Sequence, residues 1–240
     1  MPGGAVIGGS VGALAAGSLM AYAVRGRSST FFGPSAYHGN RERPSLALTF
    51  DDGPSESTPT LLRILARYDV RATFFMCGRN VERLPDIART VADAGHEIGN
   101  HSDTHPHFHF HSPRFIYEEM ARGQEIILRH AGVTPRVFRA PYGVRWFGVR
   151  EAQESLGLTG VMWSTIGKDW KWPAPRVAEL LLRRARYGEI FCLHDGRTTQ
   201  SSPDISATLE AVNKIIPPLR SEEHTSELQS LAYLVRRLLL

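Results

Sequence analysis

Short apolar runs alternate with single amphipathic helical patterns along the middle of this chain, and this alternation restricts the fold more than any other feature. One helical pattern starts at Pro59 and places Leu61, Leu62 and Leu65 on one face, and a second covers residues 83–95. Strands that are separated by single helices pair in parallel. The alternation therefore predicts an α/β fold, a (β/α) barrel whose functional site lies at the carboxyl ends of its strands. The expected strands are residues 46–50, 72–76, 97–99, 137–139, 160–163 and 190–193.

Polar and ionisable side chains directly follow these expected strands. Asp51 and Asp52 directly follow the first expected strand, in "LALTFDDGPS", although two adjacent carboxylates repel each other. Because the carboxyl ends of parallel strands meet at one end of a barrel, we expect such groups to gather there. The segments concerned are "TFDDGPS", "HSDTH" (residues 101–105), "RAPYG" (139–143), "KDW" (168–170) and "LHD" (193–195).

Two histidines and a carboxylate predict a metal site. His101 and His105 are four residues apart and can face the same way on a helical turn, so one carboxylate would complete a three-ligand site with open positions. A divalent cation would neutralise one aspartate and leave the other to act as a base. Taken singly, these segments also suit two surface histidines or an Asp-containing turn. We expect His107, His109 and His111 to be loop or surface residues and not ligands.

Together and in this order, the five segments resemble the motifs of the NodB-like polysaccharide deacetylases, carbohydrate esterase family four. The resemblance extends over residues 45–219. It implies a distorted (β/α) barrel of about seven strands. It also implies hydrolysis of the N-acetyl group on N-acetylglucosamine units of a polysaccharide, which releases acetate. The polymer stays open between peptidoglycan, a chitin-like oligosaccharide and another amino-sugar glycan.

The resemblance assigns a metal centre and a base. Asp52, His101 and His105 would hold a divalent metal, for which zinc is expected and cobalt, manganese and nickel are alternatives. Asp51 would be the general base that takes a proton from the attacking water. Arg139 would pair with Asp51, fix its geometry and keep it ionised.

The resemblance also assigns an acid and the substrate contacts. His194 would protonate the departing amine, and Asp169 would orient His194 and raise its pKa. The backbone N–H of Tyr142 would help to hold the tetrahedral oxyanion. Many relatives carry a second aspartate before "DW", but residues 166–168 read "IGK" here. The residues assigned to substrate binding are Pro141, Trp170 and Leu193, of which the last two would wall the groove around the acetyl methyl.

The amino-terminal residues look different from this domain. Residues 3–24 carry no charged side chain, so residues 1–25 are expected to form a membrane anchor or a signal peptide, with a disordered Gly/Ala tail as the alternative. Residues 26–44 mix Gly, Pro, Ser and charge, which is typical of a linker. The uncharged stretch precedes a domain whose polymer substrates, by the resemblance, lie outside the cell, which favours a cell-envelope location, either anchored or exported.

The carboxyl-terminal residues 220–240 do not match the pattern of the domain. Residues 220–230 read "RSEEHTSELQS", and codons that encode this segment resemble a widely used sequencing-library adapter. Residues 231–240 fit a short variable index followed by the rest of that adapter, so the whole of 220–240 is expected to be an adapter artefact. The alternative is a polar loop followed by a short terminal helix. Since the resemblance would place a last strand here, we expect the barrel to lack that strand and the tail to pack without specificity.

Charge and cysteine content narrow the range of partners. The net charge of +4 tolerates an anionic partner, but the arginines are scattered, which argues against a nucleic-acid footprint. Cys77 and Cys192 each lie in an apolar run, as buried free thiols do. The scattered charge therefore predicts no nucleic-acid partner. The resemblance implies an acetylated glycan as the substrate, and we expect the chain to be a monomer.

Two alternatives to N-deacetylation stay open from the sequence. The same site would also suit an O-acetyl ester or a small amide, because the motifs do not distinguish these bonds. A catalytically inactive glycan-binding protein is the second alternative, although every proposed base, acid and metal ligand is present.

Overall fold

The computed structural model describes residues 4–220 and 227–229, with side chains from residue 15 to residue 220. Its strands form one curled sheet in the order β1-β6-β5-β4-β3-β2-β8-β7, and β9 also pairs with β2. Every pairing between the described strands is parallel, as the alternation of strands and helices predicts. The strands are β1 (Ser35–Ala36), β2 (Ser45–Gly53), β3 (Thr73–Met76), β4 (Glu97–Asn100), β5 (Val137–Phe138), β6 (Thr159–Val161), β7 (Thr165–Ile166), β8 (Ile190–His194) and β9 (Glu227–Gln229).

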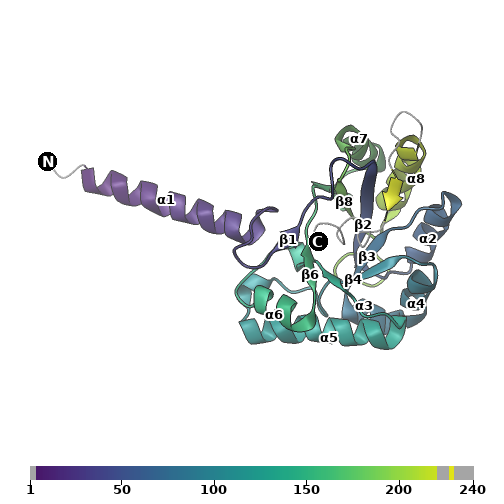
Figure 1. Cartoon of the computed structure of the whole chain (residues 1–240), viewed down its shortest axis with the longest axis horizontal. Helices are drawn as coiled ribbons and strands as arrows, with labels where there is room; N and C mark the ends of the chain where they lie inside the picture. The colour runs from purple at the N-terminus through teal and green to yellow at the C-terminus, as the bar shows by residue number, and fades with distance from the viewer. Residues whose placement is uncertain (1–3, 221–226, 230–240) are drawn as a thin grey trace.

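Amphipathic helices cover the outside of the curled sheet (Figure 1). The face of α2 that the sequence predicts is confirmed, because Leu61, Leu62 and Leu65 are all buried. α4 stops at Asp93, and Gly95 follows with a φ of 76° that favours glycine. The helices are α1 (Gly4–Arg25), α2 (Thr58–Arg67), α3 (Gly78–Arg83), α4 (Pro85–Asp93), α5 (Pro113–Ala131), α6 (Val149–Leu156), α7 (Ala174–Arg184) and α8 (Ser206–Arg220), with short 3₁₀ turns at η1 (Phe108–Phe110) and η2 (Pro141–Gly143).

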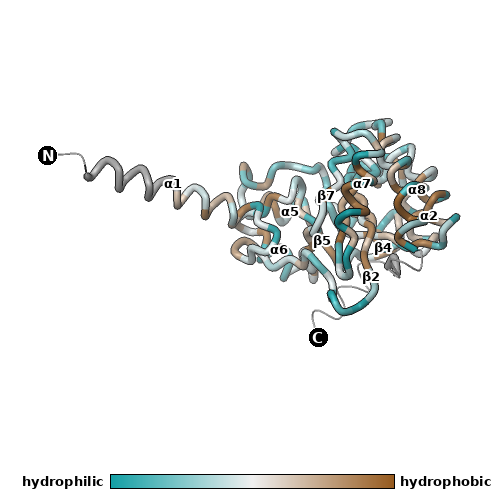
Figure 2. Tube along the Cα trace, turned by 90° about the horizontal axis from the view of Figure 1, so that it is seen from above, coloured by the Kyte–Doolittle hydropathy of each residue, from teal (hydrophilic) through white to brown (hydrophobic). Residues whose placement is uncertain are grey.

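The central strand β2 is buried on both faces. Leu46, Leu48 and Phe50 pack with the surrounding helices, whereas Ala47 packs on the inner face of the sheet. Hydrophobic segments accordingly concentrate around β2, α2 and α8 in Figure 2. Because side chains alternate along a strand, Thr49 and Asp51 share the inner face with Ala47. The inner face thus becomes polar toward its carboxyl end.

One segment of chain joins the two ends of the curled sheet. β6 pairs with β5 and β1, whereas β7 pairs with β8 at the other end. Between them, the Met162 N–H donates to the carbonyl of Ala36 at 2.7 Å and the Ser164 N–H donates to the carbonyl of Ile190 at 3.0 Å. The barrel is therefore distorted, with a break in one wall between β6 and β7.

All six strands expected from the sequence are present, and the structure adds three short ones. β1 and β7 are two residues long, and neither contains an apolar run that would mark it as a strand. β9 pairs with Ser45–Ala47 at the start of β2, where a tail without specific packing is expected. Residues 221–226 and 230–240, to which the adapter prediction also applies, lie outside the described residues.

Residues 26–44, which read as a linker, are tied to the barrel. Besides forming β1, this segment is held by the buried side chain of Arg145. The Arg145 guanidinium donates to the carbonyl oxygens of Gly26, Ser29 and Gly33, the last two at 2.6 and 3.5 Å. These contacts satisfy backbone groups that a free linker would leave to water.

The amino-terminal helix α1 projects away from the barrel (Figure 1). Over the described part of the chain, no helix combines the length and the apolar character that crossing a bilayer requires. The assignment of residues 1–25 as an anchor or a signal peptide stays a prediction.

Candidate active site

The carboxyl end of β2 turns two successive aspartates toward one cavity. Regular alternation would place Asp51 and Asp52 on opposite faces of the strand. Instead, the register against β3 shifts between Asp51 and Gly53, and Asp52 has a φ of 71°. A bulge of this kind re-aims a side chain. Both carboxylates therefore line an open cavity of about 590 Å³.

Asp52, His101 and His105 form the predicted metal-ligand group. The Nε2 atoms of His101 and His105 lie 3.4 and 3.1 Å from Asp52 Oδ1. All three side chains are buried. The other carboxylate oxygen, Asp52 Oδ2, accepts a hydrogen bond of 2.8 Å from the Thr198 N–H, which leaves Oδ1 to face the histidines.

Hydrogen bonds and burial prepare this group for a cation. His101 Nδ1 lies 2.7 Å from the carbonyl oxygen of Arg139, so Nδ1 carries the hydrogen and Nε2 keeps its lone pair. Burial acts to raise the pKa of Asp52, but its close contacts with the two imidazoles outweigh burial and hold this pKa well below its usual range. Burial lowers the pKa of His105 and favours the neutral imidazole that a metal needs.

The donor set fits a divalent metal. Tetrahedral coordination with bonds of about 2.0–2.2 Å separates ligand atoms by about 3.3–3.6 Å. The two separations measured from Asp52 Oδ1, 3.1 and 3.4 Å, are close to this spacing. His105 Nδ1 is buried and has no hydrogen-bond partner among the described residues. Three protein ligands would leave positions open for water and substrate.

Arg139 holds Asp51 from inside the barrel. Its guanidinium is fully buried, and Nη1 donates to Asp51 Oδ1 at 2.6 Å and to Thr49 Oγ1 at 2.7 Å. The other guanidinium nitrogens donate to the carbonyls of Val161 and Met162, at 3.3 and 3.1 Å. These two carbonyls lie at the break between β6 and β7. Arg139 therefore fills the break in the barrel wall and orients the carboxylate of Asp51.

His194 and Asp169 form the second predicted pair. His194 Nδ1 lies 2.9 Å from Asp169 Oδ1, and Asp169 Oδ2 accepts hydrogen bonds from the His194 N–H at 2.9 Å and from Thr208 Oγ1 at 2.5 Å. Burial acts to lower the pKa of His194, but the charge and hydrogen bond of Asp169 raise this pKa to about 9. His194 is therefore protonated at neutral pH and can donate a proton from Nε2.

The residues assigned to substrate contacts divide into two groups. Tyr142 and Trp170 line the cavity and are 40% and 48% exposed, so both aromatic rings stand at its rim. Pro141 is buried and Leu193 packs among the apolar side chains between sheet and helices. Neither is among the described residues that line the cavity, so the substrate contacts assigned to Pro141 and Leu193 stay predictions.

The three further histidines lie in the loop around η1. His107 stacks on the ring of Tyr142, with centroids 3.8 Å apart and planes inclined by 9°. Among the described residues, His107, His109 and His111 belong to neither of the two groups that could hold a metal ion. This placement agrees with their expected role as loop residues.

Thr208 and Asp195 support the site but were not assigned a role from the sequence. Thr208 belongs to α8, far from the motifs in sequence, and only the fold brings it to Asp169. Asp195 accepts a hydrogen bond of 2.7 Å from Thr58 Oγ1, and burial raises the pKa of Asp195 to about 7. A side chain at Gly53 would collide with the Asp195 carboxylate. The position of Asp195 in "LHD" is the one sequence signal that pointed to it.

Comparisons of sequence place the chain among known deacetylases. A family model described as polysaccharide deacetylase matches residues 38–161. A peptidoglycan N-acetylglucosamine deacetylase of Listeria monocytogenes is 36% identical over 68% of this chain, and the matched region spans only 35% of that relative. A chitooligosaccharide deacetylase of Bradyrhizobium is 34% identical over 73% of this chain and 84% of the relative.

Comparisons of structure agree. A family 4 carbohydrate esterase from Streptomyces lividans, in complex with acetate, superimposes with a TM-score of 0.70 at 32% identity, over 78% of this chain and 92% of that one. A family 4 pseudoenzyme from Bacillus anthracis superimposes with a TM-score of 0.76 at 26% identity, over 84% of this chain and 69% of that one. The matched family model, the curated relatives and the shared barrel show that this chain belongs to the polysaccharide deacetylase family.

Proposed function

We propose that this chain hydrolyses the N-acetyl groups of N-acetylglucosamine units in a cell-envelope or extracellular glycan. One observation carries the proposal: a base, an acid and a three-ligand metal group face the same cavity. The names of the Listeria and Bradyrhizobium relatives, which act on peptidoglycan and on chitooligosaccharides, support an acetylated amino-sugar polymer as the substrate. Such polymers lie outside the cytoplasmic membrane.

Asp52, His101 and His105 would hold the metal, and zinc is the ion that their chemistry favours. When bound, the metal polarises the acetyl carbonyl and lowers the pKa of water. Asp51 takes a proton from the attacking water, because its carboxylate lies beside the ligand group, with Oδ2 4.0 Å from His101 Nε2. Arg139 occupies Oδ1 and leaves Oδ2 to face the reaction.

His194 completes the hydrolysis. The carbon–nitrogen bond breaks as the imidazolium gives its Nε2 proton to the nitrogen of the departing amine, since an amide leaves badly as an anion. Asp169 keeps the imidazolium oriented through Nδ1. One water and one acetamido group thus yield acetate and a free amine. The backbone N–H of Tyr142, at the rim, is the proposed donor to the oxyanion.

Acetate release is the test. The full chain is stripped of metal with a chelator, and zinc, cobalt, manganese or nickel is added back to separate samples. Each sample is then assayed on acetylated peptidoglycan, chitooligosaccharides and an O-acetylated glycan. We expect release from the N-acetylated substrates only after metal is restored. No release from any of them with one metal equivalent bound would overturn the proposal, and release only from the ester would favour an O-acetyl esterase.

The resemblance to a pseudoenzyme makes an inactive glycan-binding protein a real alternative. Fold alone does not separate these functions. Against inactivity, Asp51 and His194 keep the partners that prepare each for proton transfer. Binding of a glycan without acetate release would decide for the alternative.

A further inference from the structure

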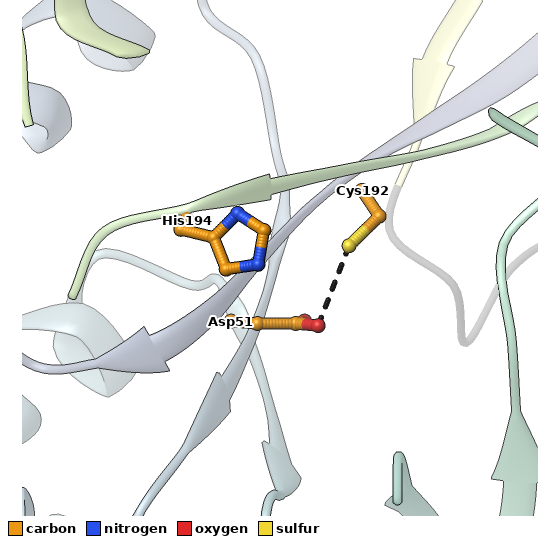
Figure 3. A group of neighbouring side chains, drawn as sticks. All are labelled: Asp51, Cys192 and His194. Carbon is orange, nitrogen blue, oxygen red and sulfur yellow. Dashed lines mark hydrogen bonds between the residues drawn. The ribbon is translucent and has the colours of Figure 1, made fainter. Parts of the chain in front are cut away.

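Cys192 lines the catalytic cavity, and the five sequence motifs give it no role there. Cys192 and His194 are two residues apart on β8, so both face the inside of the barrel. Cys192 Sγ donates a long hydrogen bond of 3.4 Å to Asp51 Oδ2 (Figure 3). The thiol therefore touches the oxygen that Arg139 leaves free.

Three kinds of metal ligand meet at this point. A carboxylate oxygen of Asp51, the sulfur of Cys192 and a ring nitrogen of His194 all lie within 4.8 Å of one another (Figure 3). His194 Nδ1 is held by Asp169, so Nε2 is the nitrogen that is available. All three residues line the cavity, and the His194 side chain is 15% exposed, so an ion would reach the fully buried sulfur of Cys192 past this ring.

We propose that Asp51, Cys192 and His194 form a second metal site, which takes a thiophilic divalent cation such as zinc in excess or cadmium. A tetrahedral zinc with one sulfur ligand separates its ligand atoms by about 3.3–3.7 Å, so the group contracts by about 1 Å around the ion. Asp51 Oδ2 and the two β8 side chains supply the ligands, and water from the cavity completes the coordination.

This site binds more weakly than the Asp52 group. The cation displaces the proton of the Cys192 thiol and the Nε2 proton of the imidazolium, and both protons pass to solvent. Arg139 also competes with the cation for the charge of Asp51. The first metal equivalent therefore occupies Asp52, His101 and His105, and the second occupies the thiol site.

Occupation of the second site stops the proposed reaction. The cation takes the lone pair with which Asp51 accepts a proton, and it removes the proton that His194 donates. This consequence rests on the proposed function, whereas the metal binding itself does not. Excess zinc is thus expected to inhibit the chain that one equivalent of zinc activates.

Cadmium titration of the metal-free full chain tests the site without any substrate. A thiolate bound to cadmium absorbs in the ultraviolet, and the Asp52 group contains no sulfur. We expect no thiolate band with the first equivalent and a thiolate band with the second. The chain has two cysteines. Cys77→Ala, the control, should keep the band, and Cys192→Val should lose it and weaken the second binding step by more than about tenfold.

Absence of a thiolate band in the unsubstituted chain, or its loss in Cys77→Ala, would overturn the proposal, and neither result depends on whether Cys192→Val folds.

A second experiment measures acetate release while zinc is added beyond one equivalent. Acetate release should fall at least tenfold in the unsubstituted chain and remain at its one-equivalent level in Cys192→Val. If no acetate is released at one equivalent, the proposed function fails, while the cadmium titration still decides whether the second site exists.

Discussion

Asp51 accepts hydrogen bonds at both carboxylate oxygens, from Arg139 at Oδ1 and from Cys192 at Oδ2. The two bonds differ in strength, because a buried guanidinium is a charged donor and a thiol is a weak one. Oδ1 is therefore fixed, whereas Oδ2 can exchange its weak partner for a water proton. This asymmetry suits Asp51 to act as a base.

Asp51→Asn should separate the base from the metal ligands. The amide still accepts from Arg139 through Oδ1, so the chain should fold and keep its metal. The rate should fall by about 10²–10⁴-fold, because an amide does not take the proton of water. Metal analysis and acetate release on the same sample measure both effects. Asp52→Asn is the matched variant and should lose metal; metal loss in Asp51→Asn instead would show that the two roles are reversed.

His194 should set an alkaline limit on activity. Its pKa is raised from 6.5 to about 9, so the imidazolium is present below pH 9 and is lost above it. The same shift contributes stability that is fully present below pH 6.5 and is lost as the pH rises through about 9. In Asp169→Asn the histidine keeps a hydrogen-bond partner but loses the nearby charge. The alkaline limb of the kcat profile should therefore move to lower pH.

Asp204→Asn is the control for this profile, because Asp204 is exposed and bonds locally to the N–H of Ser206. Its alkaline limb should stay where it is in the unsubstituted chain. An alkaline limb that Asp169→Asn leaves unmoved would show that His194 is not the acid.

Among the elements, long patterned segments were predictable and short contact-dependent ones were not. β2 and α2 carry enough apolar residues at the right period to be recognised. β1 and β7 contain two residues each and exist because β6 and β8 offer them partners. The bulge at Asp52 was also hidden, since nothing in "FDDGP" shows which residue leaves the ladder.

The position of Cys192 in the active site could not be predicted from the sequence, for a different reason. In "EIFCLHD" it looks like one more core residue, and it is indeed fully buried. Strand alternation was the signal that placed it on the same face as His194. Its contact with Asp51 depends on the pairing of β2 with β8, which sets Asp51 opposite His194 and which sequence alone did not supply.

Arg139→Lys should damage both the barrel and the site. A single ammonium cannot reach Asp51 and also both carbonyls at the break between β6 and β7, so buried groups lose their partners. We expect the free energy of unfolding to fall by about 3 kcal/mol, measured in urea, with acetate release reduced as well. Arg129→Lys is the matched control, because Arg129 is exposed and pairs with Glu125 on one helix. Its stability should change by less than about 0.5 kcal/mol.

At the scale of the whole molecule, Arg145 joins the amino-terminal segment to the barrel. Arg145→Met removes the donors to the carbonyls of Gly26 and Ser29, and should lower the free energy of unfolding by about 1–3 kcal/mol. It should also speed tryptic cleavage after Arg27. Arg150→Met, which removes one contact to Thr30, is the control. Equal rates of tryptic cleavage after Arg27 in the two variants would show that Arg145 does not hold this segment.

The origin of the carboxyl-terminal residues 220–240 affects the molecule as a whole. We propose that residues 220–240 derive from adapter sequence and not from the gene. β9 is compatible with this origin, because a short strand can pair beside β2 through backbone groups alone. Reading the gene from independent genomic DNA tests it, and the same codons in an uninterrupted frame through residue 240 would end the proposal.

The break between β6 and β7 has a consequence for how this chain can change over evolutionary time. Active-site groups commonly lower stability, so variants that lose them often fold better. Arg139 is an exception, because the guanidinium that closes the barrel wall also aligns the base. A lineage that loses catalysis therefore gains no stability by replacing Arg139. This arginine would persist in a descendant that has become inactive. Its presence marks an intact barrel and is no guarantee of turnover.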